Sequence, residues 1–477
     1  MARIAVIGAG MGAMAAAARL AVAGHRVTVY ERTATYGGAV GRFARDGFAF
    51  DTGPGLLQLP AVYRDLFVKT GREPLEKCVD LVQVDPAGRH LFDDGTGVLL
   101  PNASRAGVVA ALDAALGGGA GARWGAFLDR ARETWDRTRR PLLEEPLPAD
   151  PAPLGHDPYP APRTGLLRRG ASTLAEVGSR ELRDPRLAAL LASYALSSGF
   201  DPLTAPASAA VLPYMEQTFG NWYVRGGMRA LADAVYERCR ARKVEFVFSA
   251  EVTEVREKDG RACGLELADG RRIDAEHVVA GAPLPSVHRP HPEGGAGTGR
   301  FVVCLALRGE RPADAVHRTV VHRAESDLPM VTVLRPADPA LVPGPGHEAL
   351  TLTATVPAGG TESGAENWSG DARAGAFADR MVTAAEAAVP GLRGRLLWRE
   401  VRTPADTLRE TGSLRVPGPA LAGAGGRLLP SPNRSPLPGL HLAGGWSHPG
   451  GGLAHAGMSG ALAAGLIVEG EGFRGSQ

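Results

Sequence analysis

A glycine-rich turn that follows a short apolar strand constrains this chain more than any other feature. Residues 3–7, RIAVI, are mostly β-branched or apolar, which is typical of a buried parallel strand. Gly8, Gly10 and Ala13 then follow the G-x-G-x-x-G/A spacing. Gly12 is an additional glycine in this turn. Gly8 permits the tight turn, Gly10 lets a pyrophosphate approach the backbone, and Ala13 lets the next helix pack closely on the strand.

A second strand predicted over residues 26–30 ends at Glu31. This acid lies about 20 residues beyond the glycines, where a carboxylate accepts hydrogen bonds from an adenosine ribose and repels a 2′-phosphate. The order strand, helix, strand and acid predicts an α/β Rossmann-type fold with the phosphates at the helix N-terminus. A glycine-rich bend that binds no ligand would also give this pattern.

The next stretch, YGGAVGRFARDGFAFDTGPGLL, favours FAD over NAD. It adds Gly38, Arg42 and the pair Gly53-Pro54 just after the ribose acid. FAD lies extended, so its pyrophosphate needs more donors than one helix end provides. Arg42 would balance phosphate charge with a forked donor. Gly53 and Pro54 would bring bare backbone close to the isoalloxazine ring. Each residue alone also fits a surface turn.

A second glycine turn, GGWSHPGGGLAHAGMSG, begins at Gly444 after a short apolar strand predicted over 440–443. With the other motifs, it resembles the phytoene desaturase and carotenoid isomerase family of FAD-dependent oxidoreductases. The resemblance is carried by residues 4–57, NWYVRGGMRALADAV (221–235), the strands near FVFSAEVTEVREKDG, and 431–460. It is loosest from about 100 to 200. Amine oxidases have the same type of FAD-binding domain.

The resemblance implies a glutathione-reductase-like FAD-binding domain interleaved with a substrate domain of mixed or antiparallel sheet plus helices. It also implies that the second glycine turn faces the pyrophosphate and ribityl chain, that a helix from Leu453 points at the flavin pyrimidine edge, and that the Val252 backbone contacts adenine. The predicted cofactor-binding residues are Gly8, Gly10, Gly12, Ala13, Glu31, Arg32, Gly38, Arg42, Gly53, Pro54, Val252, Gly444, Gly445, Gly452 and Leu453.

The expected domains follow from these pieces. The FAD-binding domain is expected over 1–85, 218–290 and 425–477, and the substrate domain over 86–217, its helical part, and 291–424, its sheet part. Residues 106–135 and 173–196 have helical periodicity. The proline-rich segment 144–163 is typical of a lid or a membrane-facing rim.

Three residues are candidates for proton transfer. His455 would lie in the first turn of the second helix, where the helix dipole favours neutral imidazole, and it either takes a proton or lines the pocket. His448 precedes Pro449 and is either catalytic or a loop histidine bonded to carbonyls. Glu216 is a proton acceptor or an exposed helix acid. The family implies no obligatory catalytic base.

Aromatic residues near the same motifs are candidates for substrate contact. Trp446 is expected to form an apolar wall near the flavin ring, with Tyr223 and Trp222 beside it. Trp446, His448, His455 and Tyr223 are therefore expected to border one cavity in front of the ring.

Charge and cysteine content exclude several partners. The formal net charge is +2 with 22% charged residues, which predicts no nucleic-acid partner. The four cysteines are scattered without a CxxC pair, so we expect neither disulfides nor a metal site, and a reducing cytoplasm. The N-terminal segment has some features of a signal peptide, but Arg19 interrupts its apolar run. We expect a soluble protein with at most weak peripheral membrane contact.

The favoured function is hydride transfer between an apolar polyene or isoprenoid-like substrate and flavin N5, which gives desaturation. Reduced flavin, with NAD(P)H as an external reductant, would instead drive isomerisation or reductive cyclisation of a polyene. The motifs also fit an amine oxidase or a non-catalytic flavin-binding protein. The sequence leaves the substrate, the direction of electron flow and the oligomeric state open.

Overall fold

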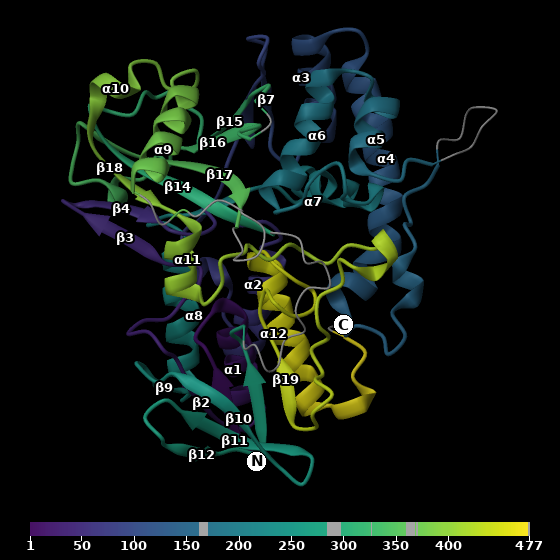
Figure 1. Cartoon of the computed structure of the whole chain (residues 1–477), viewed down its shortest axis with the longest axis vertical. Helices are drawn as coiled ribbons and strands as arrows, with labels where there is room; N and C mark the ends of the chain where they lie inside the picture. The colour runs from purple at the N-terminus through teal and green to yellow at the C-terminus, as the bar shows by residue number, and fades with distance from the viewer. Residues whose placement is uncertain (162–169, 284–296, 326, 359–367, 369–370, 476–477) are drawn as a thin grey trace.

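Two large sheets, three smaller ones and a group of helices make up the described part of the computed structural model of the chain (Figure 1). It describes residues 1–477 apart from 162–169, 284–296, 326, 359–367, 369–370 and 476–477. The expected domain boundary at 290/291 and the last residues of the proline-rich segment lie outside the described residues. Figure 1 shows the first, middle and last parts of the chain lying side by side in its lower half, around α1 and α12.

A five-stranded parallel sheet brings these distant parts together. Its order is β19-β13-β1-β2-β9, and every neighbouring pair is parallel. The strands are β1 (Arg3–Ile7), β2 (Arg26–Tyr30), β9 (Glu245–Val247), β13 (His277–Ala280) and β19 (Leu440–Leu442). β1 and β2 have the predicted bounds. The parallel sheet confirms the predicted α/β, Rossmann-type fold class.

Helices α1 (Met11–Val22), α8 (Arg229–Ala241) and α12 (Leu453–Val468) pack together beside this sheet. Small residues let α1 and α12 approach closely. A Cβ atom on Gly460 of α12 would collide with the carbonyl oxygen of Gly12 in α1. Nearly all of α1 is therefore buried, including its alanine run.

An antiparallel ribbon packs beside the parallel sheet. It consists of β10 (Val252–Lys258), β11 (Arg261–Leu267) and β12 (Arg272–Asp274), and its Leu265 and Leu267 share a core with Ala5 and Ile7 of β1. The neighbouring strands β9 and β13 do not extend this ribbon, because they pair with β2 and β1 in the parallel sheet instead.

A seven-stranded sheet forms the second layer, in the order β18-β14-β17-β16-β15-β6-β7. Its strands are β6 (Gly88–Leu91), β7 (Gly97–Leu100), β14 (Thr298–Arg308), β15 (Arg318–His322), β16 (Met330–Leu334), β17 (His347–Pro357) and β18 (Leu396–Arg402). All pairs are antiparallel except β6 with β15. One face packs on α9 (Asp371–Ala385), where Phe301 meets Trp368 and Phe377. β6 and β7 come from a segment that the sequence assigns to the helical part.

The helical group packs around Trp124, Phe127 and Leu190. Its helices are α3 (Arg105–Leu116), α4 (Ala120–Arg139), α5 (Leu174–Val177), α6 (Pro185–Ser197) and α7 (Val211–Phe219). The remaining elements are α2 (Ala61–Gly71), α10 (Leu392–Arg395), α11 (Pro404–Thr411), β3 (Arg42–Arg45), β4 (Phe48–Asp51), β5 (Leu81–Gln83) and β8 (Trp222–Val224). Within the described residues, no helix combines the length and the hydropathy needed to cross a lipid bilayer.

Candidate functional site

A cavity of about 1380 Å³ is lined by both glycine turns and reaches the helical group and the seven-stranded sheet. Of the predicted cofactor-binding residues, these line it: Gly8, Gly10, Gly12, Glu31, Arg32, Gly38, Arg42, Gly53, Pro54, Val252, Gly444, Gly445, Gly452 and Leu453. Ala13 does not line it; this residue is fully buried and packs against Gly281, which directly follows β13, the strand next to β1.

The first turn leaves room for a phosphate group. Gly10 precedes α1 without a side-chain cap, so the N–H groups of the first helical turn stay available to an anion. A Cβ atom on Gly10 would meet no atom within 4 Å, because the residue faces the open cavity. The structure therefore has the space and the donors that a pyrophosphate needs.

Glu31 is held in place by the protein itself. Its Oε2 accepts the N–H of Ala9 at 2.8 Å, and its Oε1 accepts the N–H and the hydroxyl of Thr33, both at 2.8 Å. A carboxylate has lone pairs for about four hydrogen bonds, so capacity remains for a ribose hydroxyl. Glu31 thus both fixes the turn and presents an acceptor to the cavity.

The second turn is in contact with the first. Helix α12 begins after Gly452 without a side-chain cap, so its N-terminus also faces the cavity with available N–H groups. A Cβ atom on Gly12 would lie 2.6 Å from the Cα of Gly444. Two helix N-termini from opposite parts of the chain therefore converge on one cavity, which fits a long ligand with negative charge.

Three of the predicted cofactor-binding residues also make contacts within the protein itself. A Cβ atom on Gly53 would collide with the carbonyl oxygen of Ala39, so backbone packing already requires glycine there. Arg42 donates to the carbonyl oxygen of Gly226. Arg32 donates to the carbonyl oxygens of Leu408 and Arg409 in α11, at 3.3 and 2.8 Å.

His455 lines the cavity, as expected. Burial is the largest cause that lowers the pKa of His455 to about 4, with a smaller contribution from the nearby His448. Its imidazole is therefore neutral near pH 7. A neutral imidazole at this position accepts a proton or fills space beside a ligand.

Three other predicted residues do not line this cavity. His448 is fully buried, and its Nε2 lies 3.0 Å from the carbonyl oxygen of Glu145, which turns the ring away. Tyr223 is buried and donates to Asp338 at 2.8 Å. Trp222 donates from its indole to the Phe219 carbonyl at 3.0 Å. The prediction that His448 and Tyr223 border one cavity with His455 is therefore wrong.

Glu216 lines the cavity, but it is a buried and paired acid, not an exposed one. Arg318 donates to both of its carboxylate oxygens, at 2.9 Å from Nη1 to Oε2, and Gln58 donates to Oε2 at 3.0 Å. Because both carboxylate oxygens already accept hydrogen bonds from protein side chains, the geometry favours a structural role over proton abstraction.

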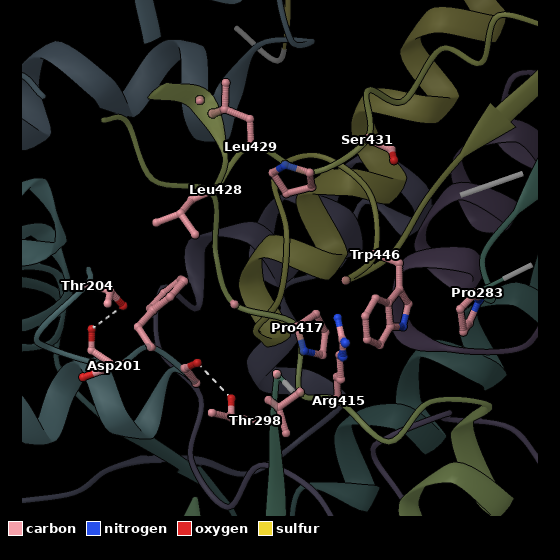
Figure 2. Close-up of a pocket in the computed structure, with 18 of the residues that line it drawn as sticks. Asp201, Thr204, Pro283, Thr298, Arg415, Pro417, Leu428, Leu429, Ser431 and Trp446 are labelled. Atoms are coloured by element: carbon pink, nitrogen blue, oxygen red, sulfur yellow. Dashed lines mark hydrogen bonds between the residues drawn. The ribbon is translucent and has the colours of Figure 1, made fainter. Parts of the chain in front are cut away.

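A second cavity of about 2090 Å³ adjoins the first, and Figure 2 shows part of its lining. Trp446, Arg415 and Pro417 line both cavities, and Figure 2 shows Trp446 between Pro283 and Pro417. Residues 145–149, 151 and 152 of the proline-rich segment line the second cavity. Trp446 therefore lies at the junction of the two cavities.

Sequence reasoning missed the polar cluster that holds the second turn. Ser459 Oγ, inside α12, accepts the N–H of Gly444 at 3.0 Å and contacts Ser447 Oγ at 3.0 Å. Asn433 donates to Ser459 Oγ at 3.1 Å and to the carbonyl oxygen of His448 at 2.7 Å. Polar residues inside an otherwise small and apolar helix are the signal that indicates such a cluster.

Comparison with known proteins relates this chain to flavin-containing enzymes. A family model described as flavin containing amine oxidoreductase matches residues 14–298. A 4,4′-diapolycopene oxygenase from Methylomonas is 33% identical over 58% of this chain and 55% of its own length. A zeta-carotene-forming phytoene desaturase from Myxococcus xanthus is 32% identical over 59% of this chain and 54% of its own length. The chain therefore spans about half the length of the curated relatives it matches.

A solved structure shows the same fold over nearly the whole chain. An oxidoreductase from Methanosarcina mazei has a TM-score of 0.65 at 17% identity, over 96% of this chain and 99% of that protein.

Proposed function

Because this chain belongs to the family of flavin-containing amine oxidoreductases, we propose that it is an FAD-dependent oxidoreductase that transfers hydride between an apolar, polyene or isoprenoid-like substrate and the flavin. The names of the relatives, an oxygenase of a diapolycopene and a carotene-forming desaturase, support this substrate class.

The observation that carries the proposal is the continuity of one cavity. The glycine turns line one part of it, and Leu59, Leu212 and Met215 line another. A flavin held by the turns would thus face apolar side chains without an intervening wall. A protein that only stores flavin has no need of this additional apolar space.

A bound flavin accepts a hydride when oxidised and donates one when reduced. The residues of the chain position the reactants. The N-terminus of α12 favours negative charge beside it, and Trp446 provides an apolar wall at the junction of the cavities. His455 is neutral and lines the cavity, where it positions the reactants or accepts a proton.

Positively charged side chains in the cavity lining disfavour an amine as substrate. Arg300 and Arg318 both line the cavity. The positive charge of Arg300 would repel a protonated amine that enters the cavity, whereas it would not repel a polyene without positive charge.

The test is anaerobic mixing of the FAD-loaded protein with two kinds of polyene, the pure hydrocarbon phytoene and the acidic all-trans-retinoate, and reaction of either one supports the proposal. We expect the yellow flavin absorbance to bleach and the product to lose two hydrogens by mass spectrometry. If the flavin works in the reductive direction, NADPH bleaches it and the polyene product gains two hydrogens or is an isomer of equal mass. A colourless protein that cannot take up FAD, yet binds NAD tightly, would overturn the proposal. Bleaching by amines but by no polyene would show an amine oxidase.

A further inference from the structure

Arg300 is a cationic side chain without a partner inside the cavity. It belongs to β14 and lines the cavity that both glycine turns share. Among the described residues, no hydrogen bond or ion pair reaches its guanidinium. The neighbouring arginines differ, since Arg318 is paired with Glu216 and Arg402 with Glu410. A guanidinium with five donors and no acceptor needs a ligand to supply one.

The position of Arg300 on the sheet directs it towards α6. Arg300 and Thr355 face each other across the β14/β17 pair, and Thr355 donates to the carbonyl oxygen of Leu196 at 2.7 Å. Thr298, two residues before Arg300, donates to the carbonyl oxygen of Gly199 at 2.8 Å. The next residue, Phe301, faces the opposite side and packs on α9. Arg300 therefore projects into the part of the cavity near the end of α6.

That part of the cavity combines polar and apolar groups. Ser197 and Ser198 at the end of α6 line it together with Val416 and Pro417. The negative groups of FAD have donors elsewhere, because the N-termini of α1 and α12 face the cavity from the parallel sheet. The anion that Arg300 lacks is thus expected from the second occupant of the cavity.

We propose that the substrate is an amphipathic polyene whose acidic oxygen group, such as a carboxylate, pairs with Arg300. This inference rests on the proposed function, because it assumes a substrate beside a bound flavin. The planar fork of a guanidinium matches the two oxygens of a carboxylate. Burial lowers the pKa of Arg300, which an anionic partner would reverse. A pure hydrocarbon offers no acceptor and would leave this cation desolvated.

The test uses two probes with the same polyene frame, all-trans-retinoic acid and all-trans-retinol, and equilibrium dialysis against the FAD-loaded full chain. We expect retinoate to bind about tenfold or more tightly than retinol, since a charge-assisted bond forms with only one of them. Arg300→Met should abolish this preference, and Arg300→Lys should retain part of it. The matched control is Arg308→Met, which removes an exposed arginine at the other end of the same strand and should leave the preference unchanged.

FAD occupancy and thermal stability are measured for every variant before a probe is added. Equal binding of retinoate and retinol to the unaltered protein would overturn the inference, as would binding of neither. Loss of flavin in Arg300→Met, or an equal loss of both probes, would show that Arg300 serves the cofactor or the fold. Failure of the unaltered chain to load FAD would overturn the proposed function itself, which separates the two failures.

Discussion

Gly12 and Gly444 are in direct backbone contact, since a Cβ atom on Gly12 would lie 2.6 Å from the Cα and 2.7 Å from the N of Gly444. The two glycine turns thus form one structure. Gly10 differs because it faces open space in an extended conformation (φ −74°, ψ 168°) that other residues adopt readily.

Gly10→Val and Gly12→Val should therefore fail in different ways. We expect Gly10→Val to fold with nearly unchanged thermal stability and to lose FAD, because its side chain occupies the space of the pyrophosphate. Gly12→Val should reduce stability even without flavin. Thermal unfolding of the apo-proteins and a titration with FAD measure both effects. Tight FAD binding by Gly10→Val would contradict the predicted position of the pyrophosphate.

Ser459→Ala should loosen the second turn, because Ser459 Oγ is the shared partner of Gly444, Ser447 and Asn433. We expect a loss of about 1–3 kcal/mol in the free energy of unfolding, since buried partners lose their hydrogen bonds. FAD affinity should fall in parallel. Ser179→Ala, at an exposed serine, is the control and should change neither quantity. Unchanged flavin affinity in Ser459→Ala would show that the cluster does not support the site.

His455→Ala tests positioning against proton transfer. We expect a loss of only a few-fold in turnover, with FAD occupancy nearly intact, because the cofactor contacts of this loop are mainly backbone. The pKa of His455 is lowered to about 4, so its titration should leave kcat/KM flat between pH 5 and 8. A proton-transfer role contributes about 10²–10⁴-fold, so a loss of that size would contradict our expectation.

Glu216→Gln should destabilise the fold by up to about 3–5 kcal/mol, because it leaves Arg318, whose side chain is only 14% exposed, without its anion. The double variant Glu216→Leu with Arg318→Met should regain most of this loss, since it removes both charges. Urea unfolding of the unaltered protein and both variants measures the difference. A catalytic acid would behave otherwise, with activity lost in Glu216→Gln and stability retained.

Acid should destabilise the protein through buried histidines such as His448, whose pKa burial lowers to about 4. In the unfolded chain its pKa is about 6.5, so the unfolded state binds the proton first as pH falls. The contribution of the neutral histidine to the free energy of unfolding is therefore complete above pH 6.5. As the pH falls from there to about 4, the free energy of unfolding declines by about 1.4 kcal/mol per pH unit for one histidine. His448→Gln should reduce the slope of stability against pH by the amount that corresponds to one proton taken up on unfolding. His156→Gln, at an exposed site, should leave this slope unchanged. An unchanged slope in His448→Gln would contradict the buried neutral state.

The backbone that surrounds the cofactor site could be predicted from the sequence, because the motifs that form it consist of residues close together in the chain. The turn from Gly8 to Ala13 and the acid Glu31 have fixed spacings, and β1 and β2 end where the pattern places them. The start of α12 at Leu453 follows a glycine run for the same reason.

The side chains around the substrate could not be predicted in this way, because their roles depend on contacts between distant segments. His448 is turned away from the cavity by Glu145 of the proline-rich segment, and Tyr223 by Asp338. Arg300 looks in sequence like the exposed end of an apolar strand. Only the sheet register and the lack of a partner among the described residues distinguish it.

The close crossing of α1 and α12 also determines when the protein can acquire its cofactor. The first glycine turn leaves the ribosome early, but Gly444 and the N-terminus of α12 are made more than 400 residues later. At synthesis rates of about 5–20 residues per second, this interval is roughly 20 to 90 seconds. During that time the alanine face of α1 has no helix to cover it. Flavin capture by both glycine turns can thus occur only after Gly444 and α12 have been synthesised.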